Sequence, residues 1–494
     1  MSLRICFNCA MGQNFYPDTI DQTLMFAPSL HDWLPEAHLA RFLVDVVSAL
    51  DLSAIYKSYE EKDGRGQAAY APEMMVRLLL YGYASGVYSS RKIQTRTFED
   101  VAFRYLSGDQ HPDHATIAEF RKRHLDALSG LFTQALLLCS AAGLVKLGHV
   151  SIDGTKIKAN ASKHKAQSYG RMGETEQRLK QEIEARLKQA EQTDAAEDAR
   201  YGKDKSGDEL PEELARRESR LKKIQQAKAA LEQEAKERAA QQRAETERKL
   251  AEREEEERRT GKKKRGRKPE ASDPEQAKPD DKAQRNFVDP ESRIMADGAN
   301  KGSFVQGYNA QIAVDSASQV IVAAEVTQEA NDKMQLIPMI AQIVANLQQK
   351  PEKVSADTGY FSEANVTDES VKGVDLYVAT GRDKHSAAVE PTGEPPPADA
   401  SPKGAAVEAN SEPPPADASP KEAMRRKLQT AAGSDVYKMR KAIVEPVFGQ
   451  IKEQRGFRRF SLRGKENVRR EWKLVCAVSN LLKLFRASLA PETA

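Results

Sequence analysis

The chain is poor in cysteine and lacks long apolar runs, and these absences exclude two classes of protein. Only four of its 494 residues are cysteine, too few for the disulfide framework of a small secreted domain. Cys6 and Cys9 form one C-x2-C pair, and no second pair follows at zinc-ribbon spacing. No apolar stretch is long enough to span a bilayer, and the N-terminus lacks the basic and apolar regions of a signal peptide. We therefore expect a reduced, cytoplasmic protein with no membrane partner.

The charge is almost balanced over the whole chain, so the total does not indicate nucleic-acid binding. The sequence holds 76 basic and 73 acidic residues, and 30% of its residues are charged against 39% hydrophobic. Phosphates are bound where Lys and Arg converge locally, so clustering matters more than the sum. The length allows two or three domains, each with its own core.

The N-terminal part predicts an all-helical domain at residues 15–145, preceded by a disordered extension at 1–14. Apolar residues recur at helical spacing in 37–50 and 113–144. Short helices with a basic one near the end are typical of a helix-turn-helix DNA-binding domain, and equally of a plain helical bundle. The basic residues that would contact phosphates are Arg91, Lys92, Arg96, Arg104, Arg121, Lys122 and Arg123.

A sheet is predicted from short β-rich runs that lie far apart along the chain. The expected strands lie in the runs 147–153, 308–316, 319–327, 353–361 and 374–380, and the fourth of them stops at Asp357. A helix at 332–349 and a basic helical segment at 434–488 complete the order strand, two hairpin strands, helix, strand, strand, helix. That order matches a ribonuclease H-like α/β core with a mixed sheet of about five strands, and its expected segments are 146–165, 286–380 and 431–488.

Polar segments interrupt this core. Residues 166–260 are dense in charged residues and Ala, and Leu214, Leu221, Ile224 and Leu231 fall on heptad positions. They predict a coiled-coil insertion, either a helical hairpin or one long helix. A basic linker is expected at 261–285. The segment 381–430 contains EPPPADASPK twice, and such a Pro-rich duplication predicts a disordered linker.

Three short blocks, each with a candidate catalytic carboxylate, lie far apart along the chain. They read SIDGTKIKANASKH (151–164), VSADTGYFSEANV (354–366) and YKMRKAIVEPVFGQIKEQRGFRRFSLRG (437–464). In this order they resemble the catalytic blocks of bacterial insertion-sequence DDE transposases, in particular the group with a coiled-coil insertion after the first Asp. The resemblance covers nearly everything from Met11 to Arg486, and it suggests that translation begins at Met11.

The resemblance implies that Asp153, Asp357 and Glu445 are the catalytic carboxylates and the ligands of Mg²⁺, with Mn²⁺ as the alternative. Hard divalent ions prefer such oxygen ligands, and two of them can break and rejoin a phosphodiester without a covalent enzyme intermediate. Taken singly, each aspartate could instead be a turn residue, because both are followed closely by Gly.

The glutamate block resembles a Tyr-x2-Arg-x3-Glu-x6-Lys signature but departs from it at one spacing. Tyr437, Arg440, Glu445 and Lys452 take the four positions, with four residues instead of three between the Arg and the Glu. At about 100° per residue, Lys441 shares the helix face of the Glu and Arg440 does not. Either basic residue could therefore contact the phosphate. Since Pro446 follows Glu445, the helix either starts or bends there.

The expected partner is double-stranded DNA, both the terminal inverted repeats of the element and its target. The predicted DNA-binding residues are Tyr437, Arg440, Lys441, Lys452, Arg455, Arg458, Arg459, Arg121, Arg123, Arg265 and Arg267. Of these, Arg265 and Arg267 lie in KKKRGRKP (262–269), which resembles a minor-groove AT-hook or is a solvated linker. Phe457, Phe460 and Trp472, interleaved with the basic strip, either stack on bases or pack in the core.

We thus expect a nucleoid-associated bacterial transposase that cleaves DNA and joins it to a target. Synapsis of two ends requires at least two protomers, so a homodimer is expected. A catalytically inactive, transposon-derived DNA-binding protein is the alternative. A structural coiled-coil protein would leave the β-rich blocks unexplained.

Overall fold

The computed structural model describes residues 29–60, 68–201, 212–261, 273–297, 302–381 and 418–490. The predicted N-terminal extension with Cys6 and Cys9, the basic segment 262–269 and most of the Pro-rich segment lie outside these residues. No helix in the described ranges has both the length and the apolar content needed to cross a membrane.

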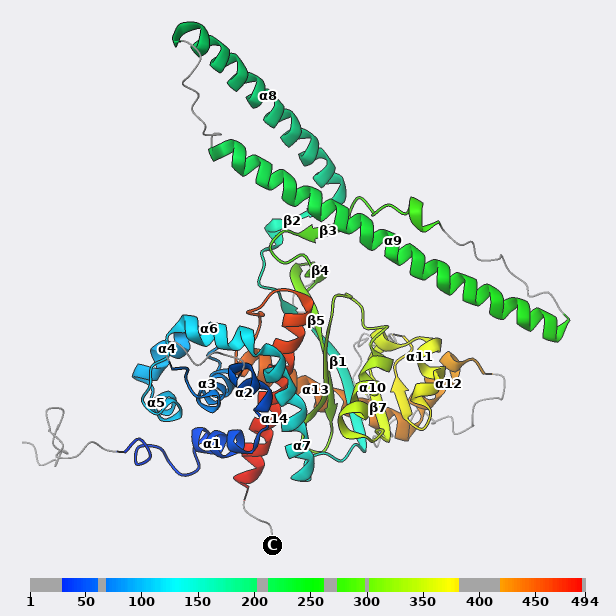
Figure 1. Cartoon of the computed structure of the whole chain (residues 1–494). Helices are drawn as coiled ribbons and strands as arrows, with labels where there is room; N and C mark the ends of the chain where they lie inside the picture. Colours follow the sequence, from blue (N-terminus) through cyan, green and yellow to red (C-terminus); the bar gives the residue numbers. More distant parts are fainter. Residues whose placement is uncertain are drawn as a thin grey trace, which may run out of the picture.

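A six-stranded mixed sheet forms the centre of the molecule (Figure 1). The strands are β1 (His149–Lys158), β4 (Arg293–Ala296), β5 (Phe304–Asp315), β6 (Ile321–Thr327), β7 (Lys353–Ala356) and β8 (Asp375–Val378). The central strand β1 pairs antiparallel with β5 on one side and parallel with β7 on the other. β6 and β4 share the outer edge of β5, and β8 pairs parallel with β7. The predicted mixed α/β organisation is confirmed.

Helices cover both faces of this sheet, because alternate residues of the central strands are apolar on each side. Ile152 and Ala313 pack in one core with Ile340 of α10 (Leu336–Leu347). Ile312 packs in another core with Val444 of α13 (Ala431–Gly449) and with α14 (Lys465–Ser488). The sheet is therefore the middle of three layers, with α13 and α14 opposite α10.

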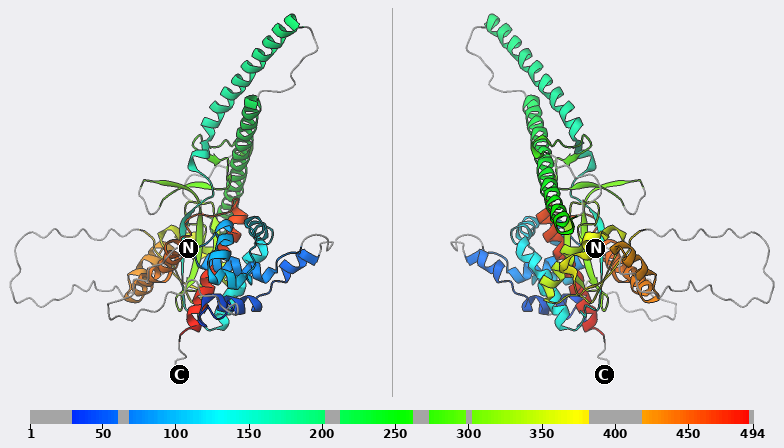
Figure 2. Two further views of the ribbon diagram at one scale, coloured as in Figure 1. Left: turned by 90° about the vertical axis from the view of Figure 1, so that its left-hand side faces the viewer. Right: turned by 90° about the vertical axis from the view of Figure 1, so that its right-hand side faces the viewer.

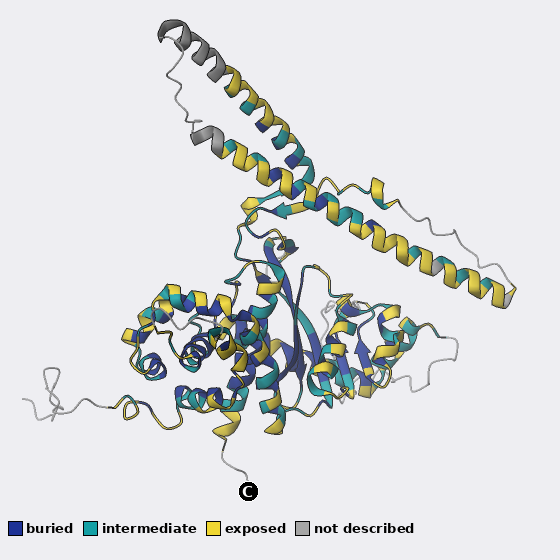
Figure 3. Ribbon diagram, in the orientation of Figure 1, coloured by how far each residue is buried: buried dark blue, intermediate teal, exposed yellow. Residues whose placement is uncertain are grey.

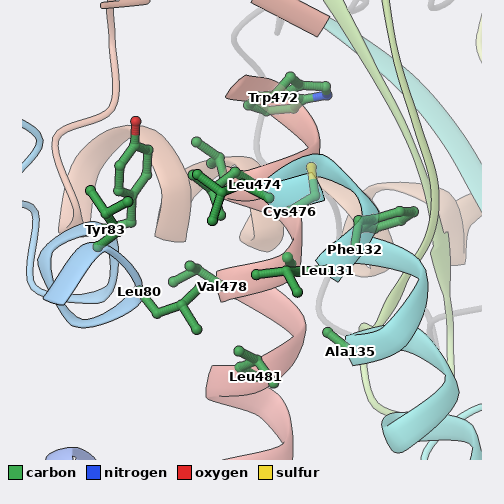
Figure 4. Close-up of a cluster of buried hydrophobic side chains, with 14 of the residues drawn as sticks. Leu80, Tyr83, Leu131, Phe132, Ala135, Trp472, Leu474, Cys476, Val478 and Leu481 are labelled. Carbon is green, nitrogen blue, oxygen red and sulfur yellow. The ribbon is translucent and has the colours of Figure 1, made fainter. Parts of the chain in front are cut away.

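The N-terminal region is helical, as predicted. Its helices are α1 (Leu39–Ala49), α2 (Ser53–Glu60), α3 (Pro72–Ala84), α4 (Ser90–Glu99), α5 (Val101–Ser107), α6 (His114–Arg123) and α7 (Leu125–Ala141). The Asp100 and Asp113 carboxylates accept backbone N–H groups at the starts of α5 and α6, the usual role of an N-cap. These helices do not form a detached unit, because Leu80 and Tyr83 of α3 and Leu131 of α7 pack against α14 (Figure 4).

Two long helices project from the sheet as an arm (Figures 1 and 2). They are α8 (Tyr169–Tyr201) and α9 (Glu212–Thr260), joined to the core through the paired strands β2 (Ala166–Ser168) and β3 (Gln284–Asn286). Met172 and Leu179 of α8 pack on Ile224 and Leu231 of α9, whereas most of the remaining described arm surface is exposed (Figure 3). A helical hairpin is therefore present, and a heptad-based supercoil stays a prediction.

Short helical turns complete the described chain. They are η1 (Lys163–Lys165), η2 (Pro274–Gln276), η3 (Thr358–Tyr360), α11 (Glu363–Thr367), η4 (Glu369–Val371), α12 (Pro420–Gln429) and η5 (Gln450–Gln454).

Two elements differ from the sequence-based expectation. β1 does not end at Asp153 but continues to Lys158, because its pairing with β5 extends that far. The last part of the predicted Pro-rich linker is helical. There the Ser419 hydroxyl accepts the Glu422 N–H at 3.3 Å, Pro420 takes the first turn, and Met424 is buried. Composition alone indicates a linker, while this local capping pattern starts a helix.

Candidate active site

Two aspartates follow the last parallel pair of β1 and β7, so they lie next to each other. Ile152 of β1 and Ala356 of β7 form the last parallel pair, and Asp153 and Asp357 follow directly. Because side chains alternate along a strand, both aspartates project on the face opposite Ile152, the face that α13 covers. The Asp153 carboxylate accepts the Gly154 N–H at 2.8 Å, and that of Asp357 accepts the Gly359 N–H at 2.8 Å.

One guanidinium group reaches this pair from α13. Arg440 is only 8% exposed, and its Nη1 lies 3.5 Å from Asp153 Oδ2. Its Nε is buried without a hydrogen-bond partner. Burial raises the pKa of Asp153 to about 6; the Gly154 N–H and Arg440 oppose this shift, and the neighbouring carboxylates of Asp357 and Asp332 add to it. The site thus holds more negative charge than Arg440 compensates, which favours a bound cation.

Asp332, in the loop before α10, was not foreseen from the sequence. Its Oδ1 accepts Asn309 Nδ2 and Gln311 Nε2, each at 2.6 Å, and lies 4.0 Å from Lys156 Nζ. The Tyr360 hydroxyl donates to Gln311 Oε1 from the other side. The sequence does contain one indication of such a residue. Asn309 and Gln311 alternate with apolar residues in β5, and buried amides need a polar partner.

Position 154 requires glycine because the Gln311 side chain lies directly against its backbone, and not because the chain turns there. A Cβ at this position would lie 2.2 Å from Gln311 Nε2 and 2.8 Å from Asp332 Oδ1. We expect Gly154→Ala to lower the free energy of unfolding by about 1–3 kcal/mol, as overpacking does. Urea unfolding measures this, with Gly130→Ala as the control. No atom lies within 4 Å of a Cβ at Gly130, in the interior of α7. The free energy of unfolding of Gly130→Ala is expected to rise by about 0.5–1 kcal/mol, because Ala is favoured over Gly inside a helix. Equal stability of the two variants would contradict the steric explanation.

The glutamate block is continuous helix, so Pro446 neither starts it nor ends it. α13 runs through Pro446 and passes into the π-helical turn η5. Glu445 lies on this helix, which covers the face that carries Asp153. Its side chain is exposed and forms no hydrogen bond or ion pair within the described part of the chain.

The basic and aromatic members of the signature take different positions. Lys452 is partly buried, and its Nζ donates to Thr155 Oγ1 at 2.6 Å on β1. The Arg440 guanidinium lies 5.7 Å from the centre of the Tyr437 ring. Lys441 is exposed. The structure therefore brings Tyr437 and Arg440 beside the aspartates, and it places Lys452 on Thr155, two residues beyond Asp153 along β1.

A complete metal-ligand set is not formed in the described ranges. No three Asp, Glu, His or Cys side chains there lie close enough together to hold a metal ion. Of the three predicted ligands, two are adjacent, and the third, Glu445, is on the covering helix.

The other predicted DNA-binding residues divide into buried and exposed ones. Arg121 is buried and donates to the Tyr88 carbonyl at 2.9 Å, and Arg455 is buried and donates to Ser479 Oγ. Their hydrogen bonds hold neighbouring segments of the fold together. The exposed residues are Arg123, Arg458 and Arg459, and the first two pair with Glu119 and Glu453. Arg265 and Arg267 fall outside the described residues.

The interleaved aromatic residues pack in the core. Phe457, Phe460 and Trp472 are almost completely buried, and Trp472 Nε1 donates to the Gln311 carbonyl at 3.1 Å. Base stacking is therefore not available to them in this conformation.

Two protein-family models match the chain. The Transposase domain (DUF772) matches residues 28–123, and the Transposase DDE domain matches residues 401–485. The first range covers α1–α6, and the second contains Arg440, Glu445 and Lys452 but neither aspartate. Comparison with curated proteins finds no match, and comparison with solved structures finds none either.

Proposed function

The chain is an insertion-sequence DDE transposase by its two matched domains, and from this premise we propose that it cleaves DNA at the ends of an insertion sequence and joins the 3′-OH ends to target DNA. DNA binding and a nuclease or transferase activity follow from the family. We propose in addition that the reaction uses two metal ions, that the residues named below carry it out, and that the enzyme acts as a homodimer in the synaptic complex.

The observation that supports it most directly is the register of the two aspartates. Asp153 and Asp357 follow the last paired residues of two adjacent parallel strands, with Arg440 beside them. The strand order β6-β5-β1-β7-β8, with β7 and β8 parallel to β1, supports the ribonuclease H-like interpretation. Neighbouring parallel strands would thus bring the two carboxylates together, as a shared metal site requires.

The donor chemistry of this edge fits a hard divalent cation. Asp153, Asp357 and a third carboxylate would hold Mg²⁺ or Mn²⁺, because such ions select carboxylate oxygens. Burial and neighbouring negative charge disfavour ionised Asp153 unless a cation is close. Bound there, a pair of ions would supply activation of the attacking oxygen and stabilisation of the leaving oxygen.

The remaining residues position the phosphodiester. Arg440, buried beside Asp153, would attract the scissile phosphate and offset its charge. Lys452 is oriented by Thr155, two residues beyond Asp153 on the same face, and would contact the next phosphate. Lys156, Asn309, Gln311 and Asp332 would hold the strand that carries Asp153.

The test is a cleavage assay on a DNA duplex that carries the element's terminal repeat, with magnesium. We expect Asp357→Asn to bind the duplex like wild type but to nick it at least about 10³-fold more slowly, because metal-ion catalysis contributes several kcal/mol. Asp368→Asn is the control, since Asp368 is half-buried and its carboxylate caps η4, a turn outside the candidate site.

Two outcomes would contradict the proposal. If wild type binds the ends but nicks them no faster than Asp357→Asn, the chain is a transposon-derived DNA-binding protein without catalytic activity. If Asp368→Asn is as slow as Asp357→Asn, the loss reflects the loop and not the metal-binding carboxylate.

A further inference from the structure

A continuous basic surface lies where the arm joins the sheet. It consists of two adjoining cavities of about 580 and 810 Å³, which share the residues His164, Lys165 and Val288. The first is formed by the end of β1, the segment after it and the loop before α14. The second is bounded by η1 and the first turns of α9. We call these two cavities together the neck surface.

The charge of the neck surface has one sign. Its basic members are Lys158, Lys163, Lys165, Arg216, Arg220, Lys223, Arg459 and Arg463, and among the residues whose side chains the structure describes no Asp or Glu lines either cavity. Because the chain as a whole has almost equal numbers of basic and acidic residues, this excess of positive charge is a local feature of the neck surface. Elsewhere on the arm opposite charges are paired along the helix, as in Lys180 with Glu176 and Arg243 with Glu247, both at 2.8 Å.

Several of these cations have no acidic partner among the residues that the structure describes. Lys158, Lys163, Lys165, Arg220 and Lys223 are exposed, and within the described residues none of them forms an ion pair. Exposed like charges in one place repel one another, so their clustering costs stability unless an anion binds. A solvated charged face of an arm helix would instead mix both signs.

The backbone beneath these side chains is fixed. The Lys158 N–H donates to the Arg458 carbonyl at 3.2 Å, and the Phe460 N–H donates to the Lys158 carbonyl at 2.9 Å. Arg463 Nε donates to the Asn160 carbonyl at 3.0 Å, and Asn286 Nδ2 donates to the Ser162 carbonyl at 2.8 Å. The backbone around Lys158, Lys163 and Arg463 is thus held in place, which lowers the entropy lost on binding.

We propose that the neck surface binds the phosphate backbone of duplex DNA and that the arm is therefore a DNA-binding element of the enzyme. This inference rests on the proposed function. β1 itself leads from Asp153 to Lys158, five residues at about 3.3 Å each, so the basic surface begins roughly 17 Å from the carboxylates. A duplex carries one charge per about 1.7 Å of its axis. DNA held at the aspartates would therefore continue with its backbone over the neck surface onto the start of α9.

The test measures binding of a fluorescein-labelled 30-base-pair DNA duplex to the full-length protein by anisotropy, over a series of salt concentrations. The variants are Lys163→Ala/Lys165→Ala on η1 and Arg220→Ala/Lys223→Ala on α9. Lys222→Ala/Arg248→Ala is the matched control, because it removes the same charge from exposed positions of α9 outside both cavities. Circular dichroism melting establishes that all of these variants are folded.

We expect each neck pair to bind the duplex roughly 10- to 50-fold more weakly at 0.1 M salt, and to lower the slope of log Kd against log salt by about 1.8, since each lost phosphate contact removes about 0.9. The control pair is expected to bind within about twofold of wild type with an unchanged slope.

Three outcomes would overturn the inference. The neck pairs and the control could show the same slope, in which case the surface does not contact DNA. The neck pairs could lose dimerisation in sedimentation velocity while keeping DNA affinity, which would make the surface a subunit interface. A labelled RNA duplex could bind wild type more tightly and lose as much affinity in the neck pairs, which would assign the surface to RNA. In each case cleavage by wild type would leave the proposed function standing, whereas wild type that neither binds nor cleaves DNA would refute both.

Discussion

Glu445→Gln is expected to lower the rate of DNA cleavage by at least about 10³-fold, whereas Asp332→Asn is expected to lower it by only about tenfold. Each of the two residues is a candidate for the third metal-binding carboxylate, beside Asp153 and Asp357. Glu445 lies on the helix that covers the face of Asp153, with Lys452 two turns further on contacting Thr155. Asp332 Oδ1 already accepts hydrogen bonds from Asn309 and Gln311, so this oxygen is engaged in holding β5.

The comparison uses cleavage of a terminal-repeat duplex with magnesium and with manganese, together with the affinity for uncut DNA. Glu363→Gln serves as the control for the glutamate, because Glu363 is exposed in the first turn of α11. Asp435→Asn serves for the aspartate, since Asp435 is exposed on α13. If Asp332→Asn abolishes cleavage and Glu445→Gln retains it, the third metal-binding carboxylate is Asp332 and the family-based assignment of Glu445 is wrong.

Glu471→Ala is expected to lower the free energy of unfolding by about 3–5 kcal/mol, because it leaves one buried and two partly buried donors without their acceptor. The Glu471 carboxylate is fully buried on α14 and accepts the N–H groups of Ser461 and Leu462 at 3.0 and 3.1 Å. It also accepts the Tyr83 hydroxyl of α3 at 3.2 Å. Burial raises the pKa of this carboxyl, and the backbone donors and Arg121 oppose the shift. One side chain thus ties the N-terminal helices and the loop before α14 to the core.

Urea unfolding, followed by tryptophan fluorescence and circular dichroism, measures the loss. Glu466→Ala, on the same helix but exposed and paired only with Arg469 at 3.1 Å, is expected to change stability by less than about 1 kcal/mol. Glu471→Gln keeps one acceptor oxygen and is expected to fall between the two. Wild-type stability in Glu471→Ala would show that the buried carboxylate has no structural role.

The order of the sheet was predictable because apolar runs and turns are local signals. The hairpin of β5 and β6 and the strands β7 and β8 lie where alternation and Gly or Asp residues place them. The end of β1 was not predictable, because it depends on pairing with β5, which lies about 150 residues away along the chain. The start of α12 was missed because the surrounding Pro-rich composition obscures the Ser419 cap.

The sequence allowed prediction of those site residues that lie in short motifs. Asp153 and Asp357 are adjacent because each follows the last residue of the parallel pairing between β1 and β7. The ribonuclease H-like strand order expected from the sequence already implies that these two strands are neighbours. The role of Arg440 was left open, since helix periodicity points it away from Glu445. A long side chain nevertheless reaches Asp153, because α13 crosses the strand ends. Asp332 carries no motif and is identified only by the tertiary contacts of β5.

The pairing of β2 with β3 has a consequence for how the chain folds. Ser168 and Gln284 oppose each other in this short ladder, so the two ends of the arm are held one strand spacing apart. Once the arm has formed, the connection from β1 to β5 behaves as a short loop, although more than a hundred residues separate Ser168 from Gln284. The entropy of loop closure grows only with the logarithm of length, and the preformed hairpin removes most of it. A change in the length of the arm at its far end should therefore leave undisturbed the register that brings Asp153 next to Asp357.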